Sequence, residues 1–357
     1  MIPHAVPHIT ALPEWNGGTL EAMYVTEALA NNEPTSGSFI PRFEDAVRSV
    51  TGAEHAVALS SGSAALHIAL LVAGIQPGDK VIVPATTFVA TANAVLQCGA
   101  EPVILDVEPD TWGLDVNRLA DYLANHPVQG VLPVHLYGHP CRLDAIRGLA
   151  QRYGAVVIED AAEALGATYK GCPIGRDGLA VLSFNGNKLV TTGGGGMLLT
   201  DDPAHAERAR TLSNQEKLDG DALIYGAGFN YRMPNVNAAI GLAQMETLAD
   251  RLASKRATAE YYQAHLPNVF TEQPWAKSSY WLPAILVDDA EETRERLARA
   301  GIEARRVWRP LSQQPHLKDC ETVGGEIAAD LYARGLTLPC SVGITDDDRA
   351  RVVAALA

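Results

Sequence analysis

The chain has 357 residues, of which 47% are apolar and 20% are charged. This length suits one large domain with a smaller one, and the composition is that of an ordinary globular protein. The formal net charge of -14 argues against nucleic acid or an anionic membrane as a partner, because either would require a basic face.

Neither a membrane segment nor a disulfide framework is predicted. The longest apolar stretch, residues 64–75, contains a histidine and is shorter than the roughly 20 residues of a membrane-spanning helix. No basic segment followed by an apolar core opens the sequence, so we expect no secretory signal. The cysteines are odd in number, scattered and never spaced as Cys-x-x-Cys, which predicts reduced thiols in the cytoplasm and no metal site.

The N-terminal two-thirds of the chain alternates strands with helices. Residues 1–35 read as an irregular segment around a short helix at 20–30, and a second helix is expected at 43–50. Strands then follow at 55–59, 80–83, 102–105, 130–134 and 155–158, and helices at 63–73, 89–97, 116–123 and 143–151. This alternation predicts an α/β fold with a mostly parallel sheet, helices on both faces, and ligands at the carboxyl ends of the strands.

The C-terminal third has a different pattern. Apolar residues at helical spacing predict a long helical segment over 236–266, which leads out of the large domain. A strand at 281–287 and a helix at 291–300 then predict a smaller α+β domain. We therefore expect a large domain over residues 1–245 and a small C-terminal domain over residues 246–357.

One lysine stands in an unusual setting within residues 181–197. An apolar strand ends at Ser183, a polar turn presents Lys188, and four glycines at 193–196 precede a second apolar strand. Such a glycine run is tolerated where another group approaches the backbone closely, which predicts a flat or bulky group against it. Lys188 is then either an exposed loop cation, the commoner case for a lysine, or a desolvated nucleophilic amine.

Three other strand ends carry candidate residues. The strand at 55–59 runs into small residues that open a helix, which is either an ordinary serine cap or a phosphate site. Phe88 follows the next strand and is either a core aromatic or a plate for a planar cofactor. Asp160 ends an apolar strand and needs a partner, which a surface salt bridge or a protonated pyridine nitrogen could provide.

Taken together, these elements match the phosphate, ring face, ring nitrogen and aldehyde of pyridoxal 5'-phosphate (PLP). The signatures of a nucleophile elbow, a phosphate loop, a dinucleotide fingerprint and a zinc-protease helix are all missing from the sequence. The best histidine cluster, His135 and His139, is expected to be structural or to face the substrate rather than to bind a metal.

The residues that carry this pattern also carry a family resemblance. Six motifs occur in this order along the chain: Ser-Ser-Gly-Ser-Ala-Ala-Leu-His-Ile-Ala-Leu, Pro-Gly-Asp-Lys-Val-Ile-Val-Pro-Ala-Thr-Thr-Phe, Val-His-Leu-Tyr-Gly, Glu-Asp-Ala-Ala-Glu-Ala-Leu-Gly-Ala, Ser-Phe-Asn-Gly-Asn-Lys and Gly-Phe-Asn-Tyr-Arg-Met. With these motifs the chain resembles the DegT/StrS family of PLP-dependent sugar aminotransferases from about residue 37 to residue 339. The resemblance implies the aspartate-aminotransferase-like fold, known as fold type I, and a homodimer.

The resemblance also implies a role for each matching residue. Lys188 would form the Schiff base with the cofactor, and Asp160 would pair with the pyridinium nitrogen, which should depress its pKa. Glu163 would lie near the ring hydroxyl, at a position where many members have glutamine. The remaining cofactor contacts are Phe88 on the ring, Gly62, Ser63, Ala64 and Ser183 at the phosphate, Asn185 beside the cofactor, and Asn230 reaching the phosphate of the neighbouring subunit's cofactor.

The reaction implied by the resemblance is transfer of an amino group from L-glutamate to a nucleotide-linked 4-keto-6-deoxy sugar. The glycine run resembles this branch of the family, and Lys188 speaks against a dehydratase branch that has histidine there. Two alternatives stay open: an aminotransferase for a keto-cyclitol or other non-nucleotide substrate, and a PLP-binding regulatory protein without turnover. Candidate contacts to the substrate diphosphate are Arg305, Arg306, Arg309 and His316.

Overall fold

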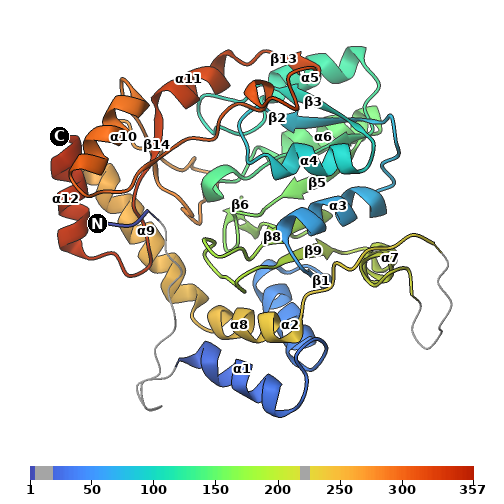
Figure 1. Ribbon diagram of the computed structural model, residues 1–357. Coiled ribbons are helices and arrows are strands. Elements are labelled where there is room, and N and C mark those ends of the chain that lie inside the picture. Colours follow the sequence, from blue (N-terminus) through green and yellow to red (C-terminus); the bar gives the residue numbers. More distant parts are fainter. Residues whose placement is uncertain (5–18, 218–225) are drawn as a thin grey trace.

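The computed structural model describes residues 1–4, 19–217 and 226–357, which form an eight-stranded sheet with helices on both faces (Figure 1). β9 runs antiparallel to both of its neighbours, β1 and β8, and the other pairs are parallel. The predicted α/β class with a mostly parallel sheet is therefore confirmed. In spatial order the strands are β1 (His55–Leu59), β9 (Gly196–Thr200), β8 (Leu179–Ser183), β5 (Val156–Asp160), β4 (Gly130–Val131), β2 (Lys80–Pro84), β3 (Glu101–Leu105) and β13 (Thr322–Val323).

Alternating side chains of the strands pack against the helices on the two faces, as the pleat of a strand requires. In β1, Val57 and Leu59 belong to one core cluster, whereas Ala56 and Ala58 belong to another. The first cluster lies under α3 (Gly62–Val72), α4 (Ala90–Gln97) and α7 (Pro203–Ser213). The opposite face is covered by α2 (Phe39–Thr51), α5 (Val116–Asn125), α6 (Leu143–Tyr153) and α8 (Asn235–Met245), and α1 (Leu20–Ala30) packs against α8.

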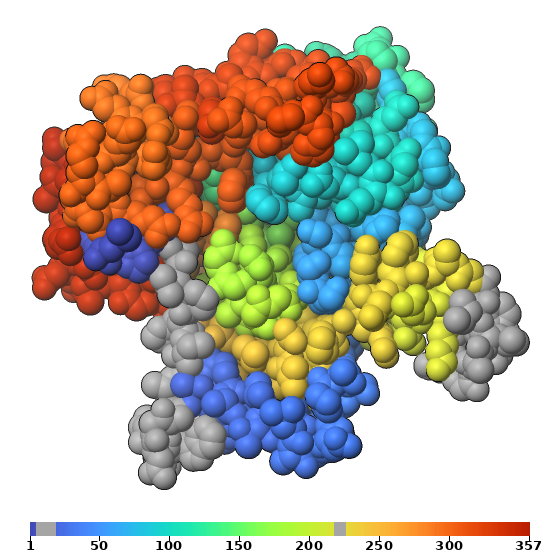
Figure 2. All heavy atoms as spheres, viewed as in Figure 1, coloured from blue at the N-terminus to red at the C-terminus, as the bar shows by residue number. Residues whose placement is uncertain are grey.

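The C-terminal part surrounds a core of its own. Helix α9 (Leu248–His265) runs from α8 to this part, whose orange and red atoms cover the upper left of the molecule (Figures 1 and 2). Tyr262, Leu297 and Leu336 are fully buried there together. This second core supports the division at residue 245, which stays a prediction, while Ala284, Ala328 and Leu331 of the same part pack into the first cluster. The elements are β11 (Ala284–Leu286), β14 (Gly335–Thr337), β12 (Arg305–Arg306), α10 (Ala290–Arg299), α11 (Glu326–Arg334) and α12 (Asp346–Leu356).

The long helical segment expected over 236–266 is present, but it is divided into two helices, α8 and α9. Between α8 and α9, Thr247 leaves helical geometry, with φ -112° and ψ 15°. Its hydroxyl donates to the carbonyl of Gln244 and accepts from the guanidinium of Arg251. A threonine that bonds locally in this way competes with the helical ladder, and the break changes the direction of the chain.

Two predicted strands are shorter than expected, and a proline explains each. β4 ends at Val131 rather than at residue 134, because Pro133 has no N–H to donate to a neighbouring strand. The strand expected at 281–287 is reduced to Ala284–Leu286 and begins directly after Pro283. A short sheet of β10 (Ala276–Lys277), β6 (Thr168–Tyr169) and β7 (Cys172–Pro173) completes the fold.

The helix expected at 20–30 is confirmed as α1. The irregular segment expected before it lies largely outside the described residues, which omit 5–18. Among the described residues no helix is both long and apolar enough to cross a bilayer.

Candidate active site

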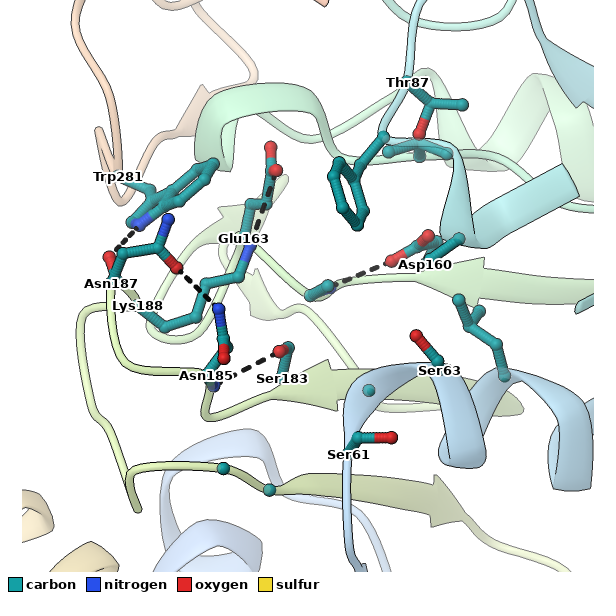
Figure 3. A pocket seen from close by; sticks show the side chains of 18 of the residues that line it. Ser61, Ser63, Thr87, Asp160, Glu163, Ser183, Asn185, Asn187, Lys188 and Trp281 are labelled. Carbon is teal, nitrogen blue, oxygen red and sulfur yellow. Dashed lines mark hydrogen bonds and ion pairs between the residues drawn. The ribbon is translucent and has the colours of Figure 1, made fainter. Parts of the chain in front are cut away.

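A cavity of about 280 Å³ opens at the carboxyl ends of β5 and β8, beside the first turn of α3. Ligands of open parallel sheets bind at this edge. Most of the predicted cofactor residues line the cavity together: Gly62, Ser63, Phe88, Asp160, Glu163, Ser183, Asn185 and Lys188. They come from four separate stretches of the sequence, which the sheet brings to one place (Figure 3).

Lys188 lies in the turn after β8, and its side chain points toward Glu163 (Figure 3). Its Nζ lies 3.5 Å from Glu163 Oε1 and 3.7 Å from the centroid of the Trp281 ring. Burial lowers the pKa of this amine, although the nearby carboxylates of Glu163 and Asp160 oppose the shift. The side chain is only 13% exposed, so Lys188 is a desolvated amine and not an exposed loop cation.

Asp160 is the last residue of β5 and is buried. Its Oδ2 accepts a hydrogen bond of 2.8 Å from the Thr91 hydroxyl, and Oδ1 accepts one of 3.2 Å from the N–H of Ala162. Burial nevertheless raises the pKa of Asp160. Without a ring nitrogen beside this carboxylate, desolvation outweighs the two donors, and the depressed pKa expected from the pairing stays a prediction. A surface salt bridge is excluded for this buried carboxylate.

Glu163 is buried beside Lys188. Its Oε2 accepts a hydrogen bond of 2.7 Å from the backbone N–H of Tyr137, and its own carbonyl accepts one of 2.9 Å from Ser279. Burial raises the pKa of Glu163 despite the charge of Lys188. Burial thus moves both members of this ion pair toward their neutral forms, which makes proton exchange between them easier.

The first turn of α3 forms an open cradle. Ser61 caps the helix by accepting from the N–H of Ala64 at 3.0 Å, so the predicted serine cap is present. A Cβ on Gly62 would lie only 2.9 Å from the Cβ of Ser183, so the chain needs glycine there. Small residues next to a helix N-terminus leave N–H groups and the positive end of the helix dipole available to an anion.

The glycine run brings the chain close to its own backbone. A Cβ on Gly196 would overlap the carbonyl of Ser61 and the amide of Gly62. The prediction that a flat or bulky group lies against the run is therefore wrong at Gly196, where the neighbour is the start of α3. Gly194 and Gly195 do line the cavity.

Aromatic rings form the remaining walls. Phe88 is 52% exposed and lines the cavity, so it is not a core aromatic. Its ring centroid lies 5.3 Å from that of Trp308, at an interplanar angle of 57°. An exposed phenyl face in a cavity suits stacking on a planar ring.

Several predicted residues lie elsewhere. Ala64 is not among the lining residues, and its N–H is taken by Ser61. Asn230 is exposed and pairs with the backbone of Asn214 outside this cavity. None of the four candidate diphosphate contacts lines the cavity: His316 bonds Asn93, Arg309 lies over the Tyr332 ring, Arg305 pairs with Glu303, and Arg306 bonds the Tyr332 carbonyl.

The predicted structural role of His135 and His139 fits their positions. His135 is fully buried, lies 3.1 Å from a carboxylate oxygen of Glu159, and accepts from the N–H of Cys141. Burial lowers the pKa of His139 to about 4, and its ring accepts from the N–H of Gln273. Among the described residues no cluster of His, Cys, Asp and Glu could hold a metal ion.

Among the residues that the sequence analysis missed, three bear most directly on the chemistry of the site. Trp281 and Trp308 come from the C-terminal part, and only the three-dimensional fold brings them to the cavity. Thr91 touches Asp160 from α4. It had a signal in the sequence, since it is a hydroxyl residue three positions after Phe88, within the helix expected at 89–97.

Comparison with known proteins agrees with the sequence motifs. The model of the DegT/DnrJ/EryC1/StrS aminotransferase family matches residues 17–357. The chain is 40% identical to a GDP-perosamine synthase of Caulobacter vibrioides, with 98% of each chain covered. It is 36% identical to a GDP-perosamine synthase of Escherichia coli O157:H7, with 92% of each chain covered.

Solved structures show the same fold. An aminotransferase of this family from Brucella abortus superposes with a TM-score of 0.90 at 26% identity, covering 94% of each chain. DesV of S. venezuelae, solved in complex with a ketimine intermediate, gives a TM-score of 0.89 at 29% identity, covering 99% of this chain and 98% of that one. The predicted fold type I architecture is confirmed.

Proposed function

Because this chain belongs to the DegT/DnrJ/EryC1/StrS aminotransferase family, as its motifs predicted, we propose that its cavity carries out a PLP-dependent amino transfer from L-glutamate to a nucleotide-linked 4-keto-6-deoxy hexose. One observation carries the assignment of the site: the buried amine of Lys188 and the buried carboxylate of Asp160 line the same cavity as the open start of α3.

The residues that line the cavity fit each chemical group of PLP. Asp160 is a buried carboxylate with no lysine or arginine bonded to it in the described structure, so a protonated pyridine nitrogen would satisfy it. The exposed face of Phe88 would stack on the ring, and Glu163 would lie on the side of the ring hydroxyl. Gly62, Ser63 and Ser183 would hold the phosphate, and Asn185 would line the cofactor site.

When bound, PLP supplies an aldehyde that takes up the amino group and a protonated ring that withdraws electrons. Lys188 would hold and move the proton at the donor's Cα, because its lowered pKa makes the neutral, basic form of the amine easier to reach than in a solvated lysine. Asp160 would keep the ring nitrogen protonated. That pairing would lower the pKa of Asp160 from its raised value in the chain alone.

We also propose a homodimer with shared sites. Asn230 is exposed and lies outside its own chain's cavity, which supports the inference that it reaches the phosphate of the partner subunit's cofactor. All five cysteines are free, which supports a reducing compartment such as the cytoplasm.

The names of the relatives support a nucleotide-linked acceptor over a keto-cyclitol, and a GDP-linked sugar is the first to test. The purified protein should become yellow with PLP, and L-glutamate should convert the chromophore to the pyridoxamine form. Product masses should then show amination of a GDP-, dTDP- or UDP-linked 4-keto-6-deoxy hexose but not of free keto-cyclitols.

The Lys188→Ala variant is the matched control and should not complete a turnover. A chromophore that L-glutamate leaves unchanged would support the regulatory alternative. Turnover restricted to keto-cyclitols would contradict the proposed acceptor.

A further inference from the structure

The indole ring of Trp281 lies directly against the amine of Lys188. The Nζ atom is 3.7 Å from the ring centroid, so it faces the negative side of the π system. The same atom is 3.5 Å from Glu163 Oε1 (Figure 3). Trp281 is only 1% exposed, and a cation–π contact is strongest where water is excluded.

The position of this ring is fixed from several directions. Trp281 Nε1 donates a hydrogen bond of 2.8 Å to the carbonyl of Asn187, the residue before Lys188. Its own carbonyl accepts from the buried Lys255 ammonium at 2.9 Å. The preceding residue, Tyr280, has φ 47°, a left-handed conformation that a bulky residue adopts only when its surroundings hold it there.

The same segment is tied to Glu163. Ser279 donates to the Glu163 carbonyl at 2.9 Å, and its N–H donates to the carbonyl of Gly138 at 3.1 Å. One short segment therefore sets the spacing between the indole face and the carboxylate that flank Lys188. The charged groups that act on this amine are Glu163 and Asp160, both from the end of β5 and the turn after it.

We propose that the Trp281 ring face and the Glu163 carboxylate together form a holding site for the Lys188 ammonium, which the side chain occupies whenever its amine is not joined to the cofactor. This inference rests on the proposed function and assigns a positioning role to Trp281, a residue of the C-terminal part. The site keeps the freed amine in the cavity, and the ring stabilises its protonated form between successive proton transfers.

The proposal can be tested on the protein without PLP. Trace acetylation with acetic anhydride, read out by mass spectrometry of the Lys188 peptide across a pH series, gives the pH midpoint at which this amine becomes reactive. The midpoint reports the pKa, whereas accessibility changes only the plateau rate. Trp281→Leu and Trp281→Phe both lose the bond to Asn187, but only the phenylalanine keeps a π face.

We expect the midpoint for Trp281→Leu to fall by about one pH unit relative to Trp281→Phe, which corresponds to about a tenfold change in the protonation equilibrium. Equal midpoints in the two variants would overturn the proposal. If either variant fails to fold, fluorinated tryptophans provide the same comparison with the ring shape kept. The midpoint should then fall stepwise as fluorine atoms weaken the ring quadrupole, and a constant midpoint would overturn the proposal.

The acetylation measurement and the test of the proposed reaction can fail separately. An unchanged midpoint in a protein that still aminates sugars would refute the holding site alone. A shifted midpoint in a protein that does not turn yellow with PLP would refute the proposed function alone.

Discussion

The hydroxyl of Thr91 donates a hydrogen bond of 2.8 Å to the carboxylate of Asp160. The hydroxyl of Thr91 also lies 3.0 Å from the hydroxyl of Thr87, and both residues are buried in the region from β2 to α4. The two hydroxyls therefore form a hydrogen-bonded series that ends at Asp160. A donor to the ionised form of a carboxylate lowers its pKa. Thr91 therefore favours the charged form of Asp160, which a protonated ring nitrogen requires.

We expect Thr91→Val to lower kcat about tenfold, because a hydrogen bond to a charged group contributes about 1.5 kcal/mol or more. Loss of the donor raises the pKa of Asp160, so the acid limb of the kcat profile should move to higher pH. Steady-state kinetics of the PLP-loaded protein across a pH series measures both effects.

Thr91→Ser keeps the hydroxyl and is the control for Thr91→Val. It should retain most of the activity and the original acid limb. A valine variant with an unchanged pH profile would show that the hydrogen bond does not tune Asp160.

Replacement of Glu163 by glutamine separates its charge from its hydrogen bond. The carboxylate raises the pKa of Lys188 by its charge, so Glu163→Gln should lower the pH midpoint for acetylation of Lys188 in the protein without cofactor. The glutamine can still accept from the N–H of Tyr137, which Glu163 does at 2.7 Å. The melting temperature of Glu163→Gln should therefore stay close to that of the wild type.

Glu163→Ala is the informative comparison. It leaves the buried N–H of Tyr137 without its acceptor, which costs about 1–3 kcal/mol of unfolding free energy. A glutamine variant as destabilised as the alanine variant would argue that the charge, and not the hydrogen bond, stabilises this part of the site.

Much of the fold follows from sequence patterns because local signals and burial agree along the strands. β1 and α1 have the predicted bounds, and the strand ends at Ser183 and Asp160 place their side chains at one edge of the sheet. Parallel strands that alternate with helices can place their carboxyl ends only on that edge. The lysine and the aspartate were therefore predictable together.

Contacts between segments far apart in the sequence were not predictable. Trp281 meets Lys188 only because a buried lysine and a strained tyrosine fix a loop of the C-terminal part. The arginines chosen as diphosphate contacts are engaged by nearby carboxylates, carbonyls or rings of their own region. The spacing of residues along the sequence does not predict such contacts between distant side chains.

Gly62 limits the space at the start of α3. A Cβ there would lie 2.9 Å from the Cβ of Ser183, so Gly62→Ala must displace Ser183 or the helix. We expect the melting temperature to fall and the affinity for PLP to drop about tenfold, since overpacking costs about 1–3 kcal/mol. Differential scanning fluorimetry and PLP titration measure the two effects.

The double variant Gly62→Ala with Ser183→Gly tests the cause, because it removes the atom that the new methyl group meets. Its melting temperature should be higher than the sum of the single effects predicts. Purely additive losses would show that the contact with Ser183 is not the reason for glycine at position 62.

Asp106 links the large sheet to the C-terminal part. This buried carboxylate follows β3 and accepts hydrogen bonds from the N–H groups of Gly325, Ile327 and Ala328 at the start of α11. Desolvation opposes its ionisation, but these donors and its bond with Val107 outweigh that cost and lower the pKa of Asp106. Asp106→Asn should reduce the unfolding free energy by about 3 kcal/mol at pH 7, because an amide replaces one acceptor oxygen by a donor.

The pH dependence of this loss follows from the lowered pKa. A carboxylate whose pKa is depressed by folding stabilises the protein above its unfolded pKa, about 3.9, and this contribution disappears as pH falls through the folded value. The difference in urea midpoint between wild type and Asp106→Asn should therefore be constant from pH 7 to pH 5 and shrink below about pH 4. The exposed Asp121 of α5 is the control, and Asp121→Asn should leave the midpoint unchanged at each pH. A difference for Asp106→Asn that persists undiminished at the lowest pH would show that its effect does not depend on the charge of the carboxylate.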